Sequence, residues 1–110
     1  MSTERDQHKA VDYIIANAKK FANAKAERVY LEEYRKSLKA ILMKQSMEAA
    51  IGAQEREAYV HDDYVELLKG LKEAVEVEEK LRWDLIAAQA RVEIWRTEQA
   101  NNRAEFKATL

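Results

Sequence analysis

Residues 64–95 read YVELLKGLKEAVEVEEKLRWDLIAAQARVEIW, and this stretch decides the fold class. With Tyr64 as the first heptad position, the inward positions recur at alternating steps of three and four residues, the spacing of a helix that packs along one neighbour. Of these ten positions, only Glu78 is not apolar: Tyr64, Leu67, Leu71, Ala74, Glu78, Leu81, Leu85, Ala88, Val92 and Trp95. The pattern predicts a long helix over about residues 62–105, with Asp62 as its N-cap.

A second long apolar pattern begins near His8 and predicts a helix over about residues 8–44. Apolar or small residues recur there at steps of three and four. They are Val11, Ile14, Ile15, Ala18, Ala22, Ala26, Tyr30, Tyr34, Leu38, Ile41 and Leu42. The run of four-residue steps from Ala18 to Leu38 exceeds the helical period, so we expect a local break in heptad packing there.

The pattern weakens between the two long segments, where residues 45–61 predict a connection that contains a short helix. Gly52 lowers helix propensity within this connection. A chain reversal here brings the long helices together. The predicted fold class is therefore all-α, a long antiparallel, coiled-coil-like helical hairpin, with residues 1–110 forming a single helical-hairpin domain.

Composition supports a helical protein. The 110 residues include no proline, two glycines and no cysteine, with 47% hydrophobic and 35% charged residues. So few turn residues argue against a β-sandwich or barrel, and the lack of cysteine excludes disulfides and thiolate metal sites. No apolar run reaches the roughly 18 residues of a membrane span, and the first residues show no secretory signal. We expect a cytoplasmic protein without a membrane partner.

Charge is unevenly distributed along the chain. Residues 1–51 hold ten Lys/Arg and seven Asp/Glu, whereas residues 52–110 hold nine Lys/Arg and thirteen Asp/Glu. A basic half and an acidic half are expected to pair within the hairpin, which competes with nucleic-acid binding by the basic half.

No pattern predicts catalysis. The two histidines are His8 and His61, and His61 precedes Asp62 and Asp63. Adjacent residues on a helix do not face one another, so we interpret this cluster as a polar helix start rather than a metal or acid–base site. Phosphate loops, zinc-binding motifs and nucleophile elbows are absent from the sequence. The prediction is a protein that is not an enzyme and uses no cofactor or metal.

The second long segment carries a further apolar row outside its heptad positions. Trp83, Ile86, Ala90 and Ile94 recur at steps of three, four and four residues, which places them on one helix face. The heptad face of this helix already packs against the other long helix of the hairpin. A second apolar face therefore needs a further helix to pack against. It predicts an oligomer or partner interface, most economically a homodimer with a four-helix section.

Two further surfaces are candidate sites. The polar segment at the bend could be a recognition loop, through Gln54, Glu55, Arg56 and Tyr59, although a solvated short helix explains it equally well. The basic residues of the first long helix, interleaved with Tyr30 and Tyr34, could hold a phosphate backbone and stack on bases. These possible nucleic-acid contacts are Lys25, Arg28, Arg35, Lys36 and Lys39. We favour the interpretation in which the tyrosines lie in the apolar seam and the cations pair with acids.

Three stretches carry a family resemblance: residues 53–59 (AQEREAY), 70–74 (GLKEA) and 94–100 (IWRTEQA). Over about residues 38–105 the chain resembles small helical-hairpin proteins of tailed bacteriophages and prophages that are encoded near early recombination genes. The resemblance implies an origin in a phage and a location in the host cytoplasm. It also implies an accessory role in phage DNA recombination or replication, by binding a recombinase, a single-strand-binding protein or a host factor. Alternatives are inhibition of a host defence or nuclease complex and direct DNA binding.

Overall fold

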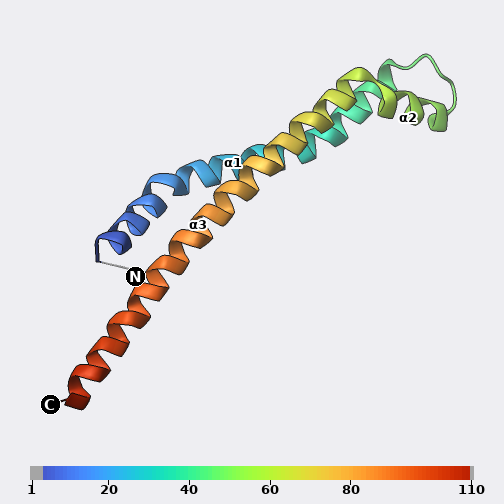
Figure 1. Cartoon of the computed structure of the whole chain (residues 1–110). Coiled ribbons are helices and arrows are strands. Elements are labelled where there is room, and N and C mark those ends of the chain that lie inside the picture. Colours follow the sequence, from blue (N-terminus) through green and yellow to red (C-terminus); the bar gives the residue numbers. More distant parts are fainter. Residues whose placement is uncertain (1–3, 110) are drawn as a thin grey trace. The chain divides into compact units, whose positions relative to one another are not determined.

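The computed structural model describes residues 4–109, with side chains from residue 6 onward. Three helices follow one another, α1 (Glu4–Gln45), α2 (Ile51–Val60) and α3 (Asp62–Thr109), and the described residues contain no strand (Figure 1). The long helices α1 and α3 pack against each other, which confirms the predicted all-α helical hairpin. Both extend beyond the predicted limits near residues 8 and 105, where good helix formers such as Gln7, Lys107 and Ala108 continue each helix.

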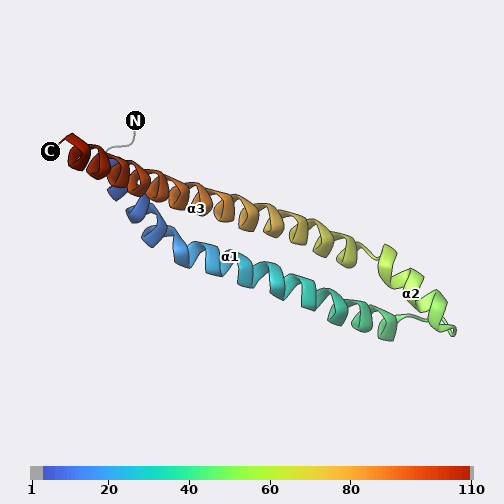
Figure 2. The same cartoon turned by 90° about the horizontal axis from the view of Figure 1, so that it is seen from below.

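Contacts within the hairpin group into two compact units. One unit combines Met1–Phe21 with Lys80–Leu110, and we call it the terminal unit. The other unit, Ala22–Glu79, contains the chain reversal, and we call it the turn unit. Each unit contains a stretch of α1 and a stretch of α3, and the turn unit also contains α2 (Figure 2).

The turn unit has a core of large apolar side chains contributed by all three helices. Leu38 and Leu42 of α1 and Tyr64 of α3 are buried together with Ala58, the one buried residue of α2. Ala58 is only 1% exposed, and its small side chain lets α2 lie close to the long helices. At the edge of this core the ring of Tyr59 meets that of Tyr64 edge-to-face at 5.3 Å between centroids.

Side-chain hydrogen bonds hold the connection between α1 and α2. The Ser46 hydroxyl donates to Glu57 Oε2 at 2.6 Å and accepts the backbone N–H of Glu48 at 3.1 Å. The Gln54 amide donates to the backbone carbonyl of Glu48 at 2.9 Å. These bonds satisfy the backbone N–H and carbonyl of Glu48, in the middle of the five-residue connection.

The start of α3 corrects the N-cap prediction. Asp62 is the first residue of the helix rather than its cap, and His61 is the residue between α2 and α3. The His61 Nδ1 atom accepts the backbone N–H of Asp63 at 3.0 Å, so the imidazole does the capping. His61 thus has a structural role at a polar helix start, as the sequence predicted for this cluster.

The predicted heptad face of α3 matches the structure. All ten of its positions, from Tyr64 to Trp95, are buried or half-buried, including Glu78 at 7% exposed. This agreement follows from the even three-four spacing, which keeps one face on the neighbouring helix along the whole segment.

The predicted face of α1 is wrong in its middle. Ala18, Ala22, Ala26, Tyr30 and Tyr34 are all exposed. The residues that turn inward in the turn unit have three-four heptad spacing instead: Ala24, Arg28, Leu31, Arg35, Leu38 and Leu42. The prediction of a local break in heptad packing is therefore wrong for this part of α1.

An ion pair explains why a polar face of α1 packs inward. The Arg28 guanidinium donates to the Glu78 carboxylate from Nε at 2.6 Å and from Nη2 at 2.9 Å. Arg28 and Glu78 thus occupy inward positions of their two helices and neutralise each other, and Glu32 accepts a further bond from Arg28 at 3.1 Å. Apolar spacing alone places Arg28 on the solvent side of α1. The spacing carries no information about Glu78, whose charge makes the burial of Arg28 favourable.

Small residues form the best-buried contacts of the terminal unit. Ala10 of α1 is 3% exposed and Ala88 of α3 is 6% exposed. The larger side chains at inward positions, such as Leu85 and Val92, are only half-buried. No described helix of the protein has the length and apolar character needed to cross a membrane.

Candidate interaction surfaces

The apolar row predicted on α3 lies in the terminal unit and faces away from the hairpin. Trp83 is 58% exposed, Ile86 37% and Ile94 52%, and Ala90 is exposed as well. We call these four residues the Trp83 row. Beside the row, the Arg82 guanidinium lies 4.8 Å from the centre of the Trp83 ring, a cation–π contact on the same helix.

The heptad residues of the same stretch occupy the opposite side of α3. Leu85, Ala88 and Val92 are buried or half-buried, whereas the Trp83 row is exposed. At about 100° per residue, the centre of the row lies roughly half a turn from these residues. The hairpin therefore cannot cover the row with α1, and the row remains an apolar surface on the described chain.

Ion pairs within α3 flank the Trp83 row. Lys80 Nζ lies 2.7 Å from Asp84 Oδ2, and Arg96 Nη1 lies 3.0 Å from Glu93 Oε1. The hydrogen bond from Lys80, with a smaller contribution from the Tyr13 hydroxyl, holds the pKa of Asp84 below its usual value. The same hydrogen bond raises the pKa of Lys80. Both side chains are therefore charged at neutral pH.

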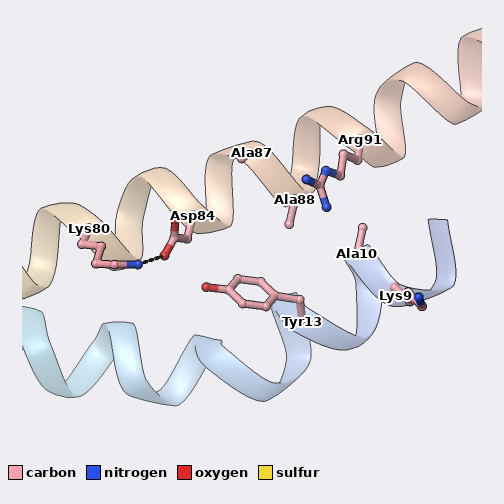
Figure 3. Close-up of a pocket in the computed structure, with 8 residues that line it drawn as sticks. All are labelled: Lys9, Ala10, Tyr13, Lys80, Asp84, Ala87, Ala88 and Arg91. Carbon is pink, nitrogen blue, oxygen red and sulfur yellow. Dashed lines mark hydrogen bonds and ion pairs between the residues drawn. The ribbon is translucent and has the colours of Figure 1, made fainter. Parts of the chain in front are cut away.

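A cavity of about 530 Å³ lies between α1 and α3 in the terminal unit (Figure 3). Its walls are Lys9, Ala10, Tyr13, Lys80, Asp84, Ala87, Ala88 and Arg91. The ring of Tyr13 points from α1 toward the Lys80–Asp84 pair of α3 (Figure 3). Sequence reasoning did not identify this cavity, although the alanine pair at residues 87 and 88 is a signal of incomplete filling. Because Asp84 stays ionised and Lys80 stays protonated, this pair is not poised for proton transfer near neutral pH.

The residues of the predicted recognition bend lie on α2, and three of them hold that helix in place. Gln54 bonds to the connection before α2. Glu55 lies 3.7 Å from Lys39 of α1, and Lys39 Nζ also lies 4.8 Å from the centre of the Tyr59 ring. Hydrogen bonding to Tyr59 is the largest cause of the raised pKa of Lys39. Arg56 is exposed.

Several of the possible nucleic-acid contacts have carboxylate partners within the turn unit. Arg28 pairs with Glu78 and Glu32, Lys39 with Glu55, and Lys36 lies 3.4 Å from Glu33 on its own helix. Thus Glu55 and Glu78 come from the acidic half of the chain, as expected, whereas Glu32 and Glu33 come from α1 itself. Lys25 and Arg35 have no carboxylate partner among the residues that the structure describes.

Arg35, Lys36 and Lys39 line one small cavity of about 390 Å³ together with Tyr59 and Tyr64. The cavity therefore brings three of the predicted cations together with two aromatic rings. Two of these cations are already neutralised by Glu33 and Glu55, which leaves Arg35 as the main uncompensated charge.

The two tyrosines of α1 are exposed rather than part of the seam, and they stack on each other. The rings of Tyr30 and Tyr34 have centroids 5.9 Å apart and an interplanar angle of 7°. At about 100° per residue, Lys25 and Lys36 lie on the opposite side of α1 from these rings. A single strand of nucleic acid that contacts the lysines would therefore not reach the stacked tyrosines on the same face.

Within residues 4–109, no group of His, Asp and Glu side chains has the arrangement needed to hold a metal ion. No protein-family model matches the chain, and no curated protein or solved structure is significantly similar to it.

Proposed function

We propose that this protein is a non-enzymatic interaction protein that forms a homodimer through the Trp83 row and acts by binding other proteins. The exposure of this row, opposite the face of α3 that packs in the hairpin, is the observation that carries the proposal. A tryptophan and two isoleucines left in water forgo roughly 1.5–3 kcal/mol for each side chain that a partner would bury. Aromatic residues in such positions often dominate the energy of an interface.

The biological setting of this proposal comes from the sequence resemblance over about residues 38–105. It supports an accessory role in phage DNA recombination or replication, through a recombinase, a single-strand-binding protein or a host factor. The alternative is inhibition of a host defence or nuclease complex, which the acidic second half of the chain favours, because acidic surfaces can mimic DNA.

Direct DNA binding through α1 is a further alternative, and the cavity lined by Arg35, Lys36 and Lys39 favours it. Partners for most of these cations argue against strong binding. Titration of a fluorescent single-stranded oligonucleotide at two salt concentrations tests this alternative. Tight binding that weakens with salt and is lost in Arg35→Glu/Lys36→Glu would establish the DNA-binding alternative.

Sedimentation equilibrium at tens of micromolar protein tests the homodimer. We expect a mass twice the 12.8 kDa of the chain for the wild type. Trp83→Glu should be monomeric, because a charged residue in the row would be buried without a partner. Phe106→Glu is the matched control, since Phe106 is 66% exposed on α3 but lies about a third of a turn away from Ile94. A wild-type mass of 12.8 kDa would contradict the homodimer.

A further inference from the structure

Trp83 and Ile94 end the Trp83 row, Ala90 lies between them, and Ile86 lies about a fifth of a turn to one side of the line from Trp83 to Ile94. Trp83 and Ile94 are eleven residues apart, about three helical turns. Between them, Ala87 and Ala90 are exposed. If two copies of α3 meet in antiparallel orientation about a two-fold axis, Trp83 comes opposite Ile94 of the second copy and Ala87 opposite Ala90 of the second copy. A parallel pair would instead place both tryptophans at one level and both Ile94 side chains at another.

One flank of the row carries opposite charges at its two ends. Lys80 and Glu98 are eighteen residues apart, about five turns, so they lie on the same side of α3. In an antiparallel two-fold pair, the same flank of each helix lies side by side. Lys80 therefore comes opposite Glu98 of the second copy, and the symmetry repeats this contact.

The other flank shows the same arrangement. Arg82 and Glu93 are eleven residues apart, about three turns, and lie on the side of the row away from Lys80. Antiparallel pairing brings Arg82 opposite Glu93 of the second copy, also twice. A parallel pair would place like charges together at all four positions, which destabilises an interface. Both flanks thus favour the antiparallel arrangement.

We infer that the occupant of the Trp83 row is a second copy of this chain, bound with α3 antiparallel to α3 and centred between Ala87 and Ala90. This inference rests on the proposed homodimer and specifies its geometry. The ion pairs between Lys80 and Asp84 and between Arg96 and Glu93 within each helix are exposed and weak, so these side chains reorient at little cost when the copies meet.

Charge reversal at Lys80 and Glu98 tests this geometry by sedimentation equilibrium. Lys80→Glu alone and Glu98→Lys alone each turn two attractions into two repulsions, and each should raise the dimer dissociation constant about tenfold. The double variant Lys80→Glu/Glu98→Lys restores both attractions and should return the constant to within about threefold of the wild type. Because the double variant still lacks the bond between Lys80 and Asp84, its recovery reports the contact between copies alone.

Disulfide formation between cysteine variants gives a second measurement, because the chain has no cysteine of its own. We expect a tagged Ala87→Cys protein mixed with an untagged Ala90→Cys protein to form the mixed disulfide faster than either protein alone forms its own. Ala100→Cys, exposed on α3 beyond the row, is the control.

If the charge reversals leave the dimer dissociation constant unchanged, or if the mixed disulfide does not form faster, the antiparallel geometry is wrong. The proposed homodimer would still stand. A monomeric wild type would overturn both.

Discussion

The two units of the hairpin bury different kinds of side chain. The turn unit packs Leu38, Leu42 and Tyr64 around a third helix and adds the Arg28–Glu78 ion pair. Among the side chains that the structure describes in the terminal unit, only Ala10 and Ala88 are buried, and a cavity of about 530 Å³ lies beside them. The turn unit therefore buries larger apolar side chains than the terminal unit, where two helices alone give little apolar burial.

The location of the large apolar side chains sharpens this difference. In the terminal unit, Trp83, Ile86 and Ile94 are on the outside, and the inward positions nearest to them hold smaller or half-buried residues. An exposed row of large apolar side chains often marks an interaction surface. The weak core of the terminal unit and its exposed row together favour the proposed role of this unit as the dimer interface.

The largest effect is expected from truncating matched leucines in the two units. Leu42→Ala in the turn unit should lower the free energy of unfolding by about 3 kcal/mol, since Leu42 is 6% exposed and its truncation creates a cavity. Leu85→Ala in the terminal unit should cost about 1 kcal/mol, because Leu85 is only half-buried. Urea denaturation at low protein concentration measures both. A larger loss of stability for Leu85→Ala than for Leu42→Ala would show that the terminal unit, not the turn unit, has the tighter core.

An intermediate effect is expected from the ion pair of the turn unit. The Glu78 side chain is 9% exposed and that of Arg28 is 24% exposed, so Arg28 reaches water more easily than Glu78. Arg28→Met leaves a buried carboxylate without this cation and should lower the Tm by about 8 °C, whereas Glu78→Met should lower it by about 3 °C. The double variant should recover most of the loss in thermal unfolding followed by circular dichroism. Equal losses in the two single variants would contradict this asymmetry.

The smallest effect concerns the Lys80–Asp84 pair of the terminal unit. Because the pKa of Asp84 is lowered in the folded protein, its contribution to stability is present above the unfolded value of 3.8 and is lost as the pH falls through the folded pKa. Asp84→Asn should therefore lower the Tm by about 1–2 °C at neutral pH, in line with an exposed pair. This difference should disappear in acid well below pH 3.8. A difference that persists there would assign the effect to packing rather than charge.

How far the sequence predicts the candidate sites depends on whether each site is local. Trp83, Ile86, Ala90 and Ile94 are found from spacing alone, since one helix places them on one face. The roles of Gln54 and Tyr59 are not found in this way, because their partners Glu48, Lys39 and Tyr64 come from other segments. The cavity beside Tyr13 is missed for the same reason, as its walls come from two helices.

Regular apolar spacing and the lack of proline are enough to predict the helical fold class, the chain reversal and the inward face of α3, because both act locally along the chain. Tertiary structure decided which face of α1 packs inward. Apolar spacing favoured Tyr30 and Tyr34, but Arg28 turns inward because Glu78, fifty residues away, supplies the opposite charge. The preference of a charged residue for water or for the interior depends on its partner, and only the folded chain brings that partner within reach.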